Sequence, residues 1–71
     1  MSVSTYKVIE VVGASEVSWE DAAKAAVETA SKTLRDLRIA EVTKLDMQIE
    51  NGKVVKYRAR INLSFKYETG N

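Results

Sequence analysis

Carboxylate and guanidinium groups are the side chains of this 71-residue sequence that could bind or position a ligand, because it contains no His and no Cys. Without Cys there is no thiol nucleophile, no disulfide, and no thiolate ligand for zinc or an iron–sulfur cluster. Without His, the commonest general base and the commonest transition-metal ligand are also missing. The glycines, Gly13, Gly52 and Gly70, are too scattered to form a phosphate-binding loop. The sequence therefore predicts a protein that binds and is not an enzyme.

Two arginines stand out in the C-terminal part of the chain. Arg58 and Arg60 lie two residues apart in an alternating segment, so they share one face of a predicted strand. On that face they either form exposed salt bridges, which are common and contribute little, or line a pocket for an anion or a planar ligand. Of these two interpretations, the salt-bridged face is favoured.

The elements that must position these side chains begin with a strand and a helix. Tyr6 to Val12 is rich in β-branched residues and stops at Gly13, which predicts a strand. Ser18 opens a segment close to a capping box, and apolar residues recur at helical spacing over 19–37. The alanine-rich face of this helix would let it lie close to a sheet, with Trp19 packed between them. Near its end the helix collects three cations, which the helix dipole favours there: Lys32, Arg35 and Arg38.

Two longer strands are predicted over 39–50 and 54–67, joined through Asn51-Gly52, the strongest short signal for a hairpin. A two-residue loop would set apolar side chains opposite charged ones. A three-residue loop, with Gly52 left-handed in a bulge, shifts the pairing by one residue. It sets apolar side chains opposite apolar ones and an acidic side chain opposite a basic one. The pairs that this register predicts are Asp46 with Arg58 and, on the apolar face, Ile49 with Val55, Met47 with Tyr57, and Leu45 with Ala59.

Acidic residues of the second strand offer two further hypotheses. Glu41 would lie opposite Leu63 in this register and interrupt the apolar face, either as a buried partner for a neighbouring subunit's arginine or beyond the edge of the helix. Asp46, Glu50 and Asn51 carry oxygen ligands of the kind that calcium needs. Their spacing is not that of an EF-hand, so a calcium site would have to be assembled across subunits.

The predicted fold class is α+β, with the order β-α-β-β. One amphipathic helix covers a three-stranded antiparallel sheet in which the last strand lies between the other two. The helix is shorter than the hairpin and cannot cover its distal apolar residues: Met47, Ile49, Val55 and Tyr57. Either the hairpin bends back onto its own helix or a neighbouring subunit covers it. The second alternative is favoured, because so short a chain has a marginal core and no disulfide to support it.

Composition narrows the partners and the location. Eleven Lys and Arg against ten Asp and Glu give a net charge of +1, so there is no broad basic field for nucleic acid or an anionic membrane. The apolar runs are too short to span a membrane, and the N-terminus lacks the features of a signal peptide. We therefore expect a cytoplasmic protein with one domain over residues 1–71 and a flexible tail over 68–71.

Several segments, taken together and in order, resemble the dodecin family. They are Tyr6 to Ser15, Ser18 to Ala23, Ile39 to Val42 and Arg58 to Lys66. The resemblance covers nearly the whole chain and includes the β-α-β-β order. It implies a hollow homododecamer with cubic symmetry that stores a small-molecule ligand and performs no catalysis. Many members stack flavins, here FMN or riboflavin, in pairs between aromatic side chains of symmetry-related subunits.

The resemblance also implies candidate site residues. The flavin-pocket positions of the family correspond to Arg38, Ile39, Glu41 and Arg58. Ile39 stands where flavin-binding members have a stacking tryptophan, and Arg58 where they have a glutamine that hydrogen-bonds the polar edge of the ring. The chain is thus more similar to the branch without that tryptophan, for which calcium binding has been described. Three hypotheses follow: a modified flavin pocket, a shell that binds calcium or another ion, and a purely structural assembly.

Overall fold

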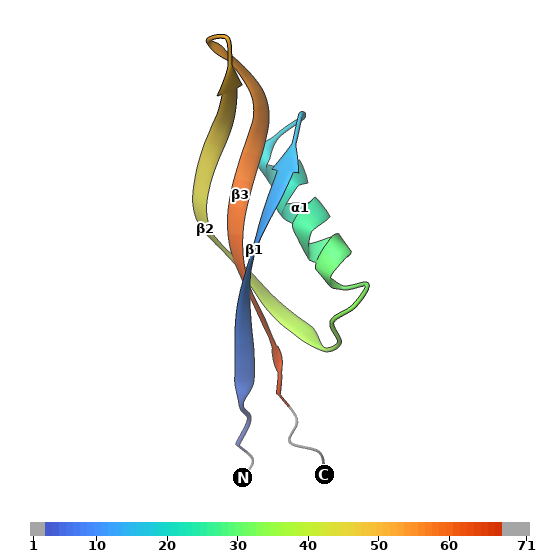
Figure 1. Cartoon of the computed structure of the whole chain (residues 1–71). Helices are drawn as coiled ribbons and strands as arrows, with labels where there is room; N and C mark the ends of the chain where they lie inside the picture. Colours follow the sequence, from blue (N-terminus) through green and yellow to red (C-terminus); the bar gives the residue numbers. More distant parts are fainter. Residues whose placement is uncertain (1–2, 68–71) are drawn as a thin grey trace.

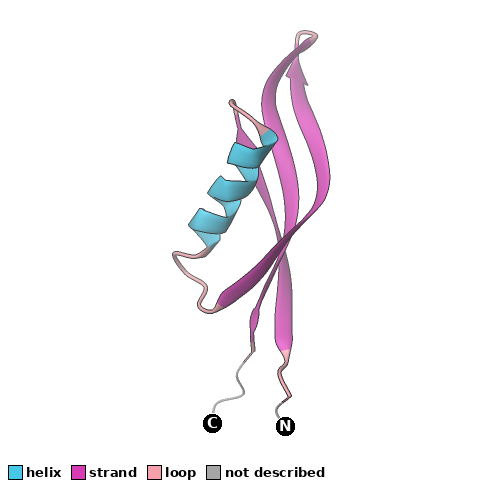
Figure 2. Ribbon diagram, turned by 180° about the vertical axis from the view of Figure 1, so that it is seen from behind, coloured by secondary structure: helices cyan, strands magenta, loops and turns pink. Residues whose placement is uncertain are grey.

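A computed structural model describes residues 3–67 as one helix on a three-stranded antiparallel sheet (Figure 1). The elements are β1 (Tyr6–Ser15), α1 (Trp19–Ala30), β2 (Leu37–Glu50) and β3 (Lys53–Lys66). The strand order is β1-β3-β2, and α1 lies against one face of the sheet (Figure 2). The predicted element order and the central place of the last strand are confirmed. The tail predicted over residues 68–71 lies outside the described residues.

The sequence predicted a strand that stops at Gly13. In the structure, β1 continues to Ser15. Gly13 pairs with Ala59 and turns its Cα toward the helix. A Cβ built there would overlap the carbonyl oxygen of Ala22 and lie 2.9 Å from the Cβ of Ala26. The glycine therefore marks a close approach of strand and helix and not the end of the strand.

The helix begins where the sequence predicted and ends earlier. The Ser18 hydroxyl accepts a hydrogen bond from the Asp21 N–H at 3.0 Å, which is the geometry of an N-cap. At the other end, the Ser31 hydroxyl donates to a backbone carbonyl, and Asp36 takes a left-handed φ of 61°. Leu37 consequently belongs to β2, so the prediction of a helix through residue 37 is wrong. The three cations predicted for its last turns follow the helix instead: Lys32, Arg35 and Arg38.

The β2–β3 register is confirmed at its centre and wrong at the turn. Met47 with Tyr57, Leu45 with Ala59, and Asp46 with Arg58 pair as predicted. The loop, however, has two residues, because Asn51 and Gly52 both have positive φ, 52° and 75°, as a tight hairpin turn requires. The extra residue lies in β3, where Ile49 pairs with Val54 and the ladder skips Val55.

A second irregularity in β2 changes the place of Glu41. The register shifts by one residue between Val42 and Lys44, so that Glu41 pairs with Asn62 and not with Leu63. Because Leu63 is buried under α1, Asn62 and Glu41 belong to the opposite face of the sheet, which we call the outer face. The prediction that Glu41 interrupts the apolar face is therefore wrong.

The core is small for a folded domain. Within residues 3–67 it consists of three alanines and two large aliphatic side chains: Ala22, Ala26, Ala59, Ile61 and Leu63. The β2–β3 hairpin extends past α1 and does not fold back onto it (Figure 1). Met47 and Ile49 are exposed, as predicted, whereas Val55 and Tyr57 are half-buried. In the described part of the chain, no helix is long and apolar enough to cross a bilayer.

Candidate functional site

The outer face carries three of the four predicted pocket residues: Ile39, Glu41 and Arg58. Residues paired across the strands form four rows on this face, since paired residues point the same way. Written in the order β1, β3, β2, the rows are Val8–Ser64–Ile39, Glu10–Asn62–Glu41, Val12–Arg60–Lys44 and Ala14–Arg58–Asp46. The face thus passes from an apolar row through an acidic row to two rows that contain arginine.

Arg58 and Asp46 form a two-pronged ion pair across β3 and β2. The Nε and Nη2 atoms of Arg58 donate to the two carboxylate oxygens of Asp46 at 2.7 and 2.8 Å. The hydrogen bonds from Arg58 hold the pKa of Asp46 below its ordinary value, and the charge of Arg60 adds to this effect. The same bonds raise the pKa of Arg58. Each group offsets the charge of the other, and the pair uses two of the five N–H donors of Arg58.

In the row Glu10–Asn62–Glu41, two carboxylates flank an amide. Glu10 and Glu41 are the β1 and β2 partners of Asn62, and neighbouring strands lie about 4.8 Å apart. Glu10 also approaches Arg60 at 3.7 Å. The row offers side-chain oxygens from three strands, which suits a hard cation such as calcium. Among residues 3–67, no group of three or more His, Cys, Asp or Glu side chains could hold a metal ion, so the amide would have to contribute.

The structure does not bring together the calcium ligands predicted from sequence. Asp46 is engaged by Arg58, and Glu50 accepts a hydrogen bond from the Gln48 amide at 3.3 Å. Asn51 lies in the hairpin turn with positive φ. Glu10 and Asn62 were missed because their meeting depends on the β1–β3 register, for which the sequence offers no turn or ion pair.

Ile39 lies far from Arg58 within one chain. Its side chain is 64% exposed, and it pairs with Ser64, whose hydroxyl donates to the Ile39 carbonyl at 3.5 Å. Ser64 is six residues from Arg58 along β3, which is about 20 Å. Arg38 lies at a register shift beside Ile39, 4.0 Å from Asp36. A pocket that contains both Ile39 and Arg58 therefore needs two copies of the chain.

Trp19 lies on the helix side of the sheet, away from these rows. Its indole N–H donates to the Asp46 carbonyl at 3.0 Å. Its ring meets that of Tyr57 edge to face, with centroids 5.1 Å apart. These contacts tie the start of α1 to the hairpin, so Trp19 packs helix against sheet, as predicted.

Comparisons with known proteins agree over almost the whole chain. The family model described as "Dodecin" matches residues 5–68. The protein named "Calcium dodecin" of Mycobacterium tuberculosis is 41% identical over 64 residues, which is 90% of either chain. The structure of dodecin from Streptomyces coelicolor is 43% identical with a TM-score of 0.90, covering 99% of this chain and 100% of that one. A crystal structure of the M. tuberculosis calcium dodecin, described as having a novel calcium-binding site, has a TM-score of 0.81 at 40% identity, with 96% and 97% covered.

Proposed function

Because the chain belongs to the dodecin family, we propose that it is a non-enzymatic binding and storage protein that assembles into a hollow homododecamer. The observation that carries this proposal is the mismatch between a five-residue core and a hairpin that extends past its helix. We further propose that residues 1–71 form a single domain. The cytoplasmic location stays a prediction.

Shape and surface support the assembly. The radius of gyration is 14.9 Å, whereas a compact chain of this length has about 11 Å. Large aliphatic side chains remain exposed along the hairpin, including Leu45, Ile49 and Val54. A monomer rarely exposes so continuous an apolar strip. Native mass spectrometry tests the proposal directly: a mass of twelve subunits supports it, and a monomer or dimer contradicts it.

For the ligand, we propose a flavin, FMN or riboflavin, bound between copies in a modified pocket of Arg38, Ile39, Glu41 and Arg58. Ile39 and its row neighbour Val8 are exposed aliphatic side chains that could pack on a flat ring, although they offer no π-face. Asp46 accepts from only two of the five N–H donors of Arg58, so the others can donate hydrogen bonds to a ring carbonyl.

Flavin fluorescence tests this pocket. Titration of flavin with the protein should quench its emission, and Ile39→Trp should strengthen the quenching by supplying a stacking surface. Lys44→Trp, on the same face of the same strand, is the matched control and should not. Unquenched flavin with the original chain, in an intact assembly, would exclude the flavin pocket.

A second candidate function is calcium binding, favoured by the acidic row of Glu10, Asn62 and Glu41 and by the similarity to a protein named calcium dodecin. Calorimetry on chelator-treated protein should detect heat on adding calcium, and Glu41→Gln should abolish it. Glu28→Gln is the control, because Glu28 is an exposed residue of α1. Absence of heat at millimolar calcium would contradict this candidate. An assembly that binds neither flavin nor calcium would have a purely structural role.

A further inference from the structure

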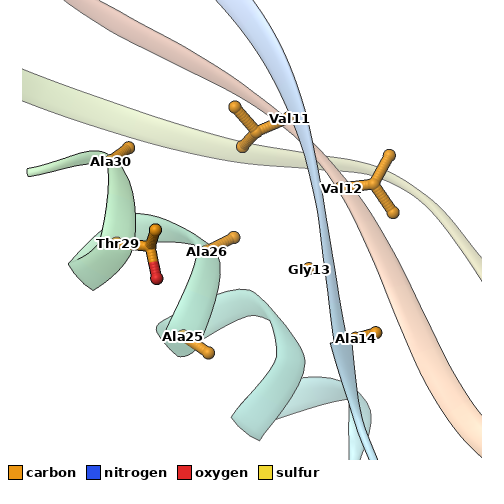
Figure 3. Close-up of a pocket in the computed structure, with 8 residues that line it drawn as sticks. All are labelled: Val11, Val12, Gly13, Ala14, Ala25, Ala26, Thr29 and Ala30. Atoms are coloured by element: carbon orange, nitrogen blue, oxygen red, sulfur yellow. The ribbon is translucent and has the colours of Figure 1, made fainter.

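A groove runs between α1 and the edge strand β1 (Figure 3). Its volume is about 420 Å³. The lining residues are uncharged and mostly small: Val11, Val12, Gly13, Ala14, Ala25, Ala26, Thr29 and Ala30. α1 contributes mainly methyl groups to the groove, so beside the close contact at Gly13 the walls leave room for larger apolar side chains.

A protruding surface with bulky apolar side chains lies at the end of the β2–β3 hairpin. The last residue pair of β1 is Ser15 with Tyr57, so residues 48–56 form a two-stranded segment, which we call the hairpin tip. The tip projects about 14 Å beyond the three-stranded part. Ile49 and Val54 pair within it and are 62% and 46% exposed. Bulky side chains therefore protrude where the chain has no helix to cover them.

We propose that the hairpin tip of one copy of this chain packs into the α1–β1 groove of a second copy. This inference rests on the self-assembly proposed above and assigns one of its contacts. Bulky aliphatic side chains would meet a wall of alanine and glycine, which gives the interdigitation that apolar interfaces require. The groove lining is uncharged. The charged residues of the tip, Glu50, Lys53 and Lys56, belong to the pairs on either side of Ile49–Val54 and so point to the other face, which keeps them out of the contact.

The exposed area is large enough for such a contact. The chain exposes 5575 Å², whereas a compact monomer of its mass exposes about 4,400 Å². The difference, roughly 1,200 Å², exceeds the roughly 800 Å² that each partner contributes to a standard interface. Tip and groove are different parts of the same chain, so the contact can repeat head-to-tail from copy to copy, and such contacts form closed rings when the rotation permits.

Crosslinking tests the contact well, because the native chain has no Cys. Ile49→Cys and Thr29→Cys place one thiol at the tip and one in the groove, both at exposed positions. The two variants are co-expressed, treated with a short bismaleimide and analysed by intact mass under denaturing conditions. Lys24→Cys replaces Thr29→Cys in the control, because Lys24 is exposed on α1 but does not line the groove.

We expect a mixed Ile49–Thr29 dimer in high yield and at least tenfold less of the Ile49–Lys24 product. The double variant, with both thiols in one chain, should give covalent species larger than dimers. Dimers alone from the double variant would mean a two-fold contact and would overturn the head-to-tail arrangement. The contact would be overturned if the Ile49–Lys24 product formed in equal yield, or if no product formed, in a mixture that native mass spectrometry shows to be dodecameric. The assembly proposal would then still stand. Failure to assemble in the original chain would overturn both.

Discussion

At the scale of single residues, the outer face is organised by charge pairing. Arg58, which the resemblance to dodecins predicts as a pocket residue, directs two of its donors at Asp46. Both side chains of the pair are nearly half exposed, at 43% and 48%. In such a setting an ion pair orients side chains more than it stabilises the fold. The pair therefore fixes the orientation of two opposite charges on this face.

The pairing predicts a shifted titration of Asp46. Its pKa is lowered mainly by the hydrogen bonds from Arg58, so Arg58→Gln should raise the Asp46 pKa toward its ordinary value of 3.8. Arg60→Gln, which removes only a nearby charge, should raise it less. Side-chain NMR of the carboxyl carbon across acidic pH measures both.

The sign of the accompanying stability effect follows from linkage. Because the folded-state pKa of Asp46 lies below the unfolded-state value, the stabilisation is fully present above pH 3.8 and is lost as the pH falls through the lowered value. Arg58→Gln should remove this acid-sensitive contribution. An Asp46 that titrates identically in the original chain and in Arg58→Gln would show that the ion pair does not persist in solution.

At the scale of elements, the distance between α1 and β1 depends on one glycine. Gly13→Ala places a methyl group against the Ala22 backbone carbonyl, which cannot rotate away. We expect a loss of about 2 kcal/mol or more in the free energy of unfolding, as for other overpacked sites. Urea unfolding at a fixed protein concentration measures it.

Gly52→Ala is the matched control for that substitution. Gly52 has a φ of 75° and open space around its Cα, so alanine there meets only the backbone penalty, about 1 kcal/mol. A Gly13→Ala variant no less stable than Gly52→Ala would mean that α1 can move away from β1 at little cost.

The sequence predicted the elements better than their ends. Ser18 and the alternation in β3 carry strong local signals, and the structure follows both. Leu34 and Leu37 continue the helical spacing in the sequence, so the sequence predicted them in the helix. In the structure α1 ends at Ala30, and β2 begins at Leu37, directly after the left-handed Asp36. The spacing of apolar residues reports where side chains lie, but it does not report the backbone angle of the one residue at which an element ends.

The site was predictable only where pairing could be argued from a turn. The Asn51-Gly52 hairpin and the apolar pattern were enough to place Asp46 opposite Arg58. Glu41 was misplaced because a bulge beside Thr43 reverses the faces of the strand beyond it, and bulges leave little trace in a single sequence. Asn62 meets Glu10 only through the pairing of β1 with β3, which no local pattern in the sequence specifies.

At the scale of the whole molecule, the chain combines an undersized core with two unfilled surfaces, the α1–β1 groove and the hairpin tip. The large side chains fully buried within residues 3–67 are Ile61 and Leu63. If the chain assembles as proposed, contacts with other copies supply part of the stability of each subunit.

This dependence predicts that stability changes with protein concentration. If twelve subunits separate as they unfold, each tenfold dilution lowers the stability per subunit by about 1.2 kcal/mol, because mass action favours the separated chains. Trp19 is the only tryptophan and packs against Tyr57, so its fluorescence should report the loss of the helix–hairpin contact. Urea midpoints measured at three concentrations, each checked by native mass spectrometry, should fall on dilution. A midpoint that stays constant while the assembly dissociates would show that the isolated subunit is stable, and the small core would then be sufficient by itself.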